Sequence, residues 1–198
     1  MKTVAKILVF QLFLVIMAGA IEYQLFVDED DVFAPCENQP GNPSNSDSLF
    51  DPTWKITTHG GKVAIEAQQT VVWKDVQPGD TVKLFAQVFR MEKNTWQKTM
   101  ISVNSNNFCK NMFDKGQYWY QFWTQYIRNS DEIKTKCIVT PGAVIKYNPI
   151  DVELKVNLNV PNMSGRYKVV VQFDAFDKSN VKRPVSICSE FRGNITKV

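Results

Sequence analysis

The sequence predicts an all-β fold: an antiparallel β-sandwich with one short helix between Cys109 and Cys137. Apolar and polar residues alternate along several segments, which is typical of strands that bury one face and expose the other. A single aromatic segment instead spaces its large side chains as a helix does. The alternating segments amount to about six to eight strands, a number that suits a sandwich.

Three strands and a turn are expected in the first half of the chain. Residues 63–67 alternate between apolar and polar side chains, and further apolar residues follow at 71–73. The sequence Gln-Pro-Gly-Asp at 77–80 predicts a turn. A longer strand is expected at 82–89, with apolar residues on both of its faces, and a short one at 100–103.

The clearest alternation lies in the second half. Apolar residues occupy every second position from 152 to 160 and again from 167 to 175. A turn sequence, Pro-Asn-Met-Ser-Gly, separates the two segments at 161–165. Two alternating segments around a turn predict an antiparallel hairpin, and Val185 and Ile187 begin a last strand.

The aromatic segment predicts the inserted helix. Four large side chains repeat at positions i, i+3, i+4 and i+7, which places them on one helical face: Trp119, Phe122, Trp123 and Tyr126. We expect a helix of about two to three turns that ends at 129–131. Two interpretations of the aromatic face stay open: it plugs a filled core, or it caps an apolar cavity between two sheets.

Residues 1–20 have the pattern of a cleavable secretory leader. Lys2 and Lys6 form its basic region, an apolar segment follows, and small residues end it at Ala20. The apolar segment is shorter than the roughly 20 residues that a membrane-spanning helix needs. We therefore expect residues 21–198 to form one secreted, extracellular domain without a transmembrane segment.

Removal of the leader nearly cancels the net charge. The full chain carries 23 basic and 20 acidic side chains, and the leader contributes Lys2 and Lys6 but no acid. No run of Lys or Arg remains to form an electrostatic footprint for nucleic acid. The sequence therefore indicates no nucleic-acid partner.

Four cysteines, an even number, are typical of exported proteins and predict two disulfides. A zinc site is not indicated, because no two cysteines have the close spacing of structural zinc ligands. Three pairings are open. We favour the nested one, in which Cys109 pairs with Cys137, and Cys36 pairs with Cys188.

Two sequons for N-glycosylation also indicate export. They begin at Asn162 and Asn194, and in each a residue other than proline is followed by Ser or Thr. Asn42 is followed by proline and does not qualify.

The sequence does not indicate an enzyme. His59 is the single histidine, and no nucleophile signature accompanies it. Phosphate loops and clusters of metal ligands are also missing from the sequence, so we predict no catalytic residue, metal or cofactor. A lipid hydrolase is the remaining alternative, with His59 as its only obvious base.

Several motifs around the middle cysteines carry a family resemblance. Phe-Cys-Lys stands at 108–110, Lys-Cys-Ile-Val-Thr-Pro-Gly at 136–142 and Tyr-Asn at 147–148, while Cys188 lies near the end. In this order, and over most of the chain after the leader, the sequence resembles the insect chemosensory CheB family. That family is similar to the lysosomal ganglioside-activator protein and to the lipid-recognition, or ML-type, β-sandwich domains.

The resemblance implies a β-cup, in which two antiparallel sheets enclose an apolar cavity with a helical or mobile segment at its mouth. It also implies secretion by accessory cells of taste hairs and a role in sensing contact pheromones, with cuticular hydrocarbons as the ligand class. The ganglioside activator has more cysteines than the four found here, so its glycolipid specificity is not carried over.

Two functional hypotheses follow. In the first, the protein binds or presents a hydrophobic, lipid-like small molecule. The expected contacts are four aromatic residues at the mouth and three residues of the cup wall: Trp119, Phe122, Trp123, Tyr126, Leu154, Val156 and Phe173. In the second, the domain has a filled core and acts through its surface on a taste receptor or ion channel of a sensory neuron, without a bound ligand.

Overall fold

A computed structural model describes most of the chain after the expected leader. It covers residues 21–28, 33–37, 39–51, 55–59, 62–66, 68–148, 150–158 and 160–198. The expected leader, residues 1–20, lies outside the described residues. Within the described part, no helix is long and apolar enough to cross a membrane.

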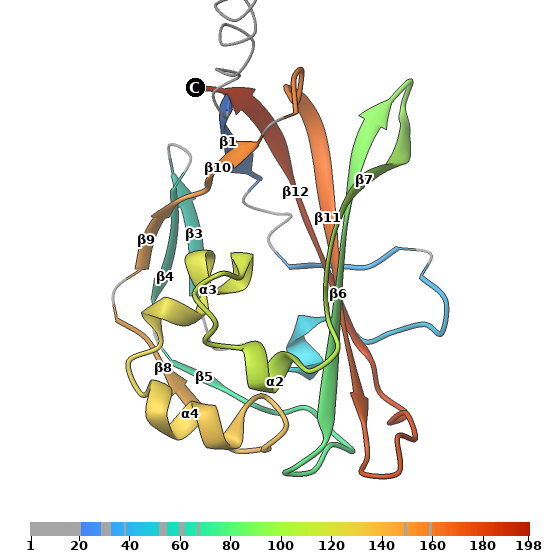
Figure 1. Ribbon diagram of the computed structural model, residues 1–198, viewed down its shortest axis with the longest axis vertical. Coiled ribbons are helices and arrows are strands. Elements are labelled where there is room, and N and C mark those ends of the chain that lie inside the picture. The colour runs from blue at the N-terminus through green and yellow to red at the C-terminus, as the bar shows by residue number, and fades with distance from the viewer. Residues whose placement is uncertain are drawn as a thin grey trace, which may run out of the picture.

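A seven-stranded antiparallel sheet forms one layer of the molecule (Figure 1). Its strands follow the order β10-β1-β12-β11-β6-β7, and β2 also pairs with β12. The strands are β1 (Ile21–Val27), β2 (Ala34–Pro35), β6 (Thr81–Glu92), β7 (Thr95–Ser105), β10 (Lys155–Leu158), β11 (Gly165–Phe176) and β12 (Ile187–Lys197). We call this layer the large sheet.

Two smaller sheets and most of the helices lie together on one side of the large sheet (Figure 1). The smaller sheets have the orders β3-β4-β9 and β5-β8. Their strands are β3 (Lys55–His59), β4 (Lys62–Glu66), β5 (Gln68–Thr70), β8 (Val144–Lys146) and β9 (Ile150–Glu153). The helices are η2 (Ser46–Ser48), α2 (Phe108–Asn111), α3 (Tyr118–Phe122), η3 (Thr124–Tyr126) and α4 (Ser130–Lys136). The predicted all-β sandwich, with a helical insert between Cys109 and Cys137, is confirmed.

Two tight turns hold β6 in place. The predicted turn at 77–80 is present: the Gln77 amide donates to a carboxylate oxygen of Asp80, and the Asp80 amide donates to the Gln77 carbonyl. At the other end of β6, Lys93 and Asn94 both have positive φ angles, 47° and 63°. Two successive residues with positive φ match the right-handed twist of a hairpin, so β6 and β7 pair directly.

The hairpin predicted for the second half is wrong. The alternating segment 152–160 is interrupted at Leu154, and its two parts pair with different strands, β9 with β4 and β10 with β1. Segment 167–175 lies within β11, which pairs with β12 and β6. Two strands, β1 and β12, therefore separate β10 from β11. Alternation indicates which side chains share one face of a strand, but it carries no information about which strand is the partner.

The single helix predicted for the aromatic segment is also interrupted. α3 ends at Phe122, and Trp123 leaves the helical region with φ −139° and ψ −70° before the separate turn η3 begins. Residues 129–131 begin α4 rather than end the earlier helix. Bulky aromatic side chains are weaker helix formers, and here the packing of Trp123 decides the backbone.

Both disulfides are present, in the nested pairing. Cys36 bonds Cys188, which ties the segment after β1 to β12, with a Cα–Cα distance of 5.7 Å. Cys109 bonds Cys137, which joins α2 to the end of α4, with a Cα–Cα distance of 5.6 Å. The second bridge closes the helical insert into a loop whose ends cannot separate.

Candidate functional site

Two buried apolar clusters lie on the inner side of the large sheet, the side that carries the helices. The larger one includes Trp73, Phe108, Met112 and Ile133, and it joins the helices to the lower half of the sheet in Figure 1. The smaller cluster lies toward the other end of the strands and contains four residues: Tyr23, Met163, Tyr167 and Ile195.

The seven predicted ligand contacts border these two clusters. All of them are partly buried, and none belongs to the fully buried core: Trp119, Phe122, Trp123, Tyr126, Leu154, Val156 and Phe173. We call these seven residues the apolar belt. Six of them pack against the larger cluster, whereas Val156 packs against the smaller one.

Phe108 brings three members of the belt together. Its ring is fully buried and lies 5.5 Å from Trp119, 5.9 Å from Trp123 and 5.3 Å from Phe173, measured between ring centroids. The Trp123 ring is stacked on Phe108, and the other two are edge-on. These are the geometries that aromatic pairs prefer, so the contacts stabilise the cluster beyond the area they bury. Phe108 was not predicted as a site residue, because one phenylalanine beside a cysteine has no distinguishing pattern.

Hydrogen bonds hold the indole rings of Trp119 and Trp123 in place. The indole N–H of Trp119 donates to the carbonyl of Asn111 at 3.0 Å, and that of Trp123 donates to the hydroxyl of Tyr147 at 2.9 Å. The Tyr147 hydroxyl in turn donates to the side-chain carbonyl of Gln69. Burial raises the pKa of Tyr147, so this hydroxyl keeps its proton in the chain of hydrogen bonds. Both indole rings are therefore fixed.

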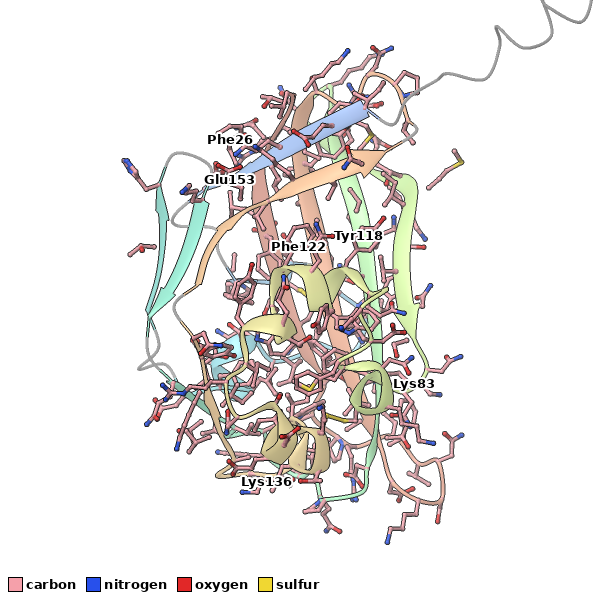
Figure 2. All side chains as sticks on the ribbon, turned by 60° about the vertical axis from the view of Figure 1, so that its left-hand side comes forward. Phe26, Lys83, Tyr118, Phe122, Lys136 and Glu153 are labelled. Atoms are coloured by element: carbon pink, nitrogen blue, oxygen red, sulfur yellow. A yellow bond between two sulfur atoms is a disulfide. The ribbon has the colours of Figure 1, made fainter. Side chains whose placement is uncertain are left out.

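Phe122 and Tyr118 differ from the anchored tryptophans. Figure 2 shows both residues on the side of α3 that faces β1 and β10. Tyr118 is 49% exposed and Phe122 is partly buried. Trp119, Phe122, Trp123 and Tyr126 of the aromatic segment thus all pack against the larger cluster while remaining partly open to solvent, and Tyr118 is the most exposed ring of the segment. The packing against the larger cluster agrees with the core-plug interpretation, and the cap over an apolar cavity stays a prediction.

A polar hollow of about 420 Å³ lies on another part of the surface, between α4 and the β5-β8 sheet. It is lined by Gln68, Glu132, Lys136, Gly142, Val144 and Lys146. The ammonium of Lys136 contacts Glu132 at 2.6 Å, and its hydrogen bond, with a second one from Asn129, lowers the pKa of that carboxyl. No sequence pattern indicates this hollow, because its residues come from three separate segments. Its polar lining does not suit an apolar ligand.

The remaining predicted residues lie at the surface. His59 is the last residue of β3, opposite Lys62, and is exposed. Among the described residues, no group of three or more His, Cys, Asp or Glu side chains could hold a metal ion. Asn162 and Asn194, the two sequon asparagines, are both exposed and therefore accessible to a glycosylating enzyme.

Comparison of the sequence with models of known protein families and with curated proteins gives no match. The resemblance to the CheB family therefore rests on the motifs at 108–110, 136–142 and 147–148.

Proposed function

We propose that the protein is a secreted chemosensory protein that binds or presents a hydrophobic, lipid-like ligand against the apolar belt. The ligand class that we propose is that of contact pheromones and cuticular hydrocarbons. The observation that carries this proposal is the belt itself. Seven apolar side chains border two buried clusters, and none of them is fully buried.

The energetics favour an alkyl ligand. Each methylene transferred from water to an apolar site contributes about 0.8 kcal/mol. A chain with ten methylenes against the belt would gain about 8 kcal/mol, before the cost of immobilising it. Contact with the rings of Phe122 and Tyr126 adds apolar area without requiring a charged group on the ligand.

Action outside the cell is supported by the covalent structure. Two disulfides close the domain, and disulfides persist in oxidising compartments such as the extracellular space. The exposed sequon asparagines Asn162 and Asn194 are compatible with the same route. The chemosensory part of the proposal, and its link to taste hairs, rests on the resemblance to the CheB family.

A second candidate function is favoured by the larger buried cluster. Trp73 and Phe108 are fully buried there, and the indoles of Trp119 and Trp123 are anchored by hydrogen bonds. A domain filled in this way could act on a taste receptor or channel of a sensory neuron through its surface alone. This candidate differs from the first in one measurable respect, since it needs no bound ligand.

Native mass spectrometry with organic extraction, together with titration of a fluorescent fatty-acid probe, tests the proposal. We expect a bound apolar species and displaceable probe binding. Phe122→Ser should weaken probe binding about tenfold, because it removes a ring that Figure 2 places on the side of α3 facing β1 and β10. Phe85→Ser is the matched control: Phe85 is 42% exposed and lies on the outer face of β6, so binding should not change.

Two results would contradict the ligand proposal. The first is a protein that carries no apolar species and does not bind the probe, which would favour the surface-acting module. The second is an equal loss of probe binding in Phe122→Ser and Phe85→Ser, because the probe would then be reporting general hydrophobic exposure.

A further inference from the structure

We infer that Gln87, by stabilising a bulge in β7, prevents the edge of the large sheet from pairing with a second copy of this chain. The inference is independent of the proposed ligand. It starts from β7, which is the last strand of the sheet order and pairs with β6 alone among the described strands. With 11 residues, β7 is long enough to accept a further strand.

A bulge interrupts the pairing of β7 with β6. Gln87 pairs with Ser102, but Phe89 pairs with Lys98, so Val88 stands opposite three residues, 99–101. The edge strand therefore contains two residues more than its partner needs.

The side chain of Gln87 holds the bulge. Its amide nitrogen lies 2.9 Å from the carbonyl oxygens of Val88 and Thr99, and 3.0 Å from that of Ile101. Gln87 is only 3% exposed, although it lies in a strand among apolar residues. The polar side chain thus replaces the backbone hydrogen bonds that the bulge removes from the ladder.

Thr99 completes the arrangement. Its hydroxyl donates to the Val88 carbonyl at 2.8 Å and accepts from the Ile101 amide at 3.1 Å. Met100, between these two residues, is fully exposed. A flat row of free N–H and C=O groups is what another strand would need, and the bulge breaks that row at the middle of β7.

The opposite edge of the large sheet is protected in a different way. β10 has only four residues, and Lys155 of β10 forms an ion pair with Glu153 at 2.6 Å. Short strands and edge lysines are common means of preventing edge-to-edge association, and so are bulges. The long edge needs the bulge because its length alone would favour pairing.

The register of β6 and β7 defines a variant that lacks the bulge. Deletion of Thr99 and Met100 would place Ile101 opposite Val88 and restore one regular ladder from Leu84 to Glu92. Side chains alternate with a period of two, so removing two residues leaves every inward-facing side chain on its own face. Gln87→Val accompanies the deletion, because the amide would lose its bulge partners.

The test compares this variant with the full-length wild-type chain by light scattering coupled to gel filtration, over a hundredfold range of protein concentration. We expect the wild type to stay monomeric and the deletion variant to form dimers or larger species. Amide hydrogen exchange along β7 should slow in the associated form. Met100→Ala is the control, since it keeps the bulge and should remain monomeric.

A substitution-only variant keeps the test decisive if the deletion prevents folding. Gln87→Leu with Thr99→Val removes both side-chain clamps without shortening the chain, and it should shift the protein toward association in the same direction. Monomeric behaviour of a folded variant with a regular β6-β7 ladder would overturn the inference. So would a wild-type dimer that Met100→Ala dissociates, because β7 would then be an interface rather than a guarded edge.

Discussion

On the inner face of β11, Tyr167 and Phe173 pack against the two apolar clusters. On its outer face, Lys168 is 6% exposed and forms an ion pair with Glu190 of β12, which is fully buried. Arg192 also contacts Glu190, at 3.0 Å. The same two strands therefore present an apolar surface to one side and a buried charge network to the other.

The two faces differ in the energetic cost of a side chain that lacks part of its packing or its partner. An apolar side chain that is partly exposed forfeits only part of its burial energy, so Phe173 of the belt can remain partly open to solvent. A buried charge without its partner carries a large desolvation cost. Accordingly, both oxygens of Glu190 are contacted by Lys168, at 2.9 and 3.1 Å, and one of them also by Arg192. The inner face, whose apolar side chains can stay partly exposed at small cost, is the one that we propose binds a ligand.

The largest expected effect comes from removing a buried ring from the larger apolar cluster. Phe108→Ala should lower the free energy of unfolding by about 4 kcal/mol, because it removes a fully buried ring that contacts three others. Urea unfolding followed by circular dichroism measures this change. Phe85→Ala, on the outer face of β6 and 42% exposed, should cost less than about 1 kcal/mol. Equal losses for the two variants would contradict the assignment of the core to the inner face.

On the outer face, removing one charge from the ion-pair network should lower the stability of the fold. Glu190→Gln should cost about 3 kcal/mol, because Lys168 then stays buried without a counter-charge. The double variant Lys168→Met with Glu190→Met should lose less than this single one, since no buried charge of that pair remains. Urea unfolding of both variants separates the two cases. A double variant that is less stable than the single one would show that the pair stabilises the fold by its mutual attraction.

A smaller effect should come from an ion pair at the end of the sheet. Arg183 makes two hydrogen bonds to Asp80, at 2.8 and 2.9 Å, and the bond from Arg183 holds the pKa of Asp80 below its ordinary value of 3.8. A carboxyl with a lowered pKa in the folded state stabilises the protein above pH 3.8, and this contribution is lost as the pH falls through the lowered value. Thermal unfolding of the wild type should therefore shift down more steeply in acid than that of Asp80→Asn. Parallel acid profiles of the two proteins would contradict this.

The comparison of the two faces also shows what the sequence could predict. Of the positions that the alternation at 167–175 assigned to the core, Tyr167, Val171, Phe173 and Ala175 do belong to or contact the inner clusters, but Val170 of the opposite set is also buried. The alternation gave no sign that Lys168, at a position that it assigns to solvent, would be buried with Glu190. Their contact depends on the pairing of β11 with β12, and pairing is set by the whole sheet rather than by either strand.

The candidate site was predictable to a similar extent. Helical spacing brought together Trp119, Phe122, Trp123 and Tyr126, and all four do pack against the larger cluster. No sequence pattern marks the break at Trp123, whose indole hydrogen-bonds Tyr147, a residue from a distant part of the chain. Gln87 was missed for a related reason. A polar residue within a strand normally indicates a solvent face, and only the extra residues of β7 give this one buried partners.

The place of β1 in the large sheet has a consequence for how the protein is made. Ile21 pairs with Leu158 of β10, and Val27 pairs with Gly193 of β12, so the earliest described strand lies between two of the latest. A ribosome releases β1 long before either neighbour exists. The sheet is therefore completed from its interior and only at the end of synthesis, and contacts so distant in sequence form slowly. Until then the backbone N–H and C=O groups along both edges of β1 lack the strands that pair with them in the folded sheet, so the nascent chain exposes two unpaired strand edges.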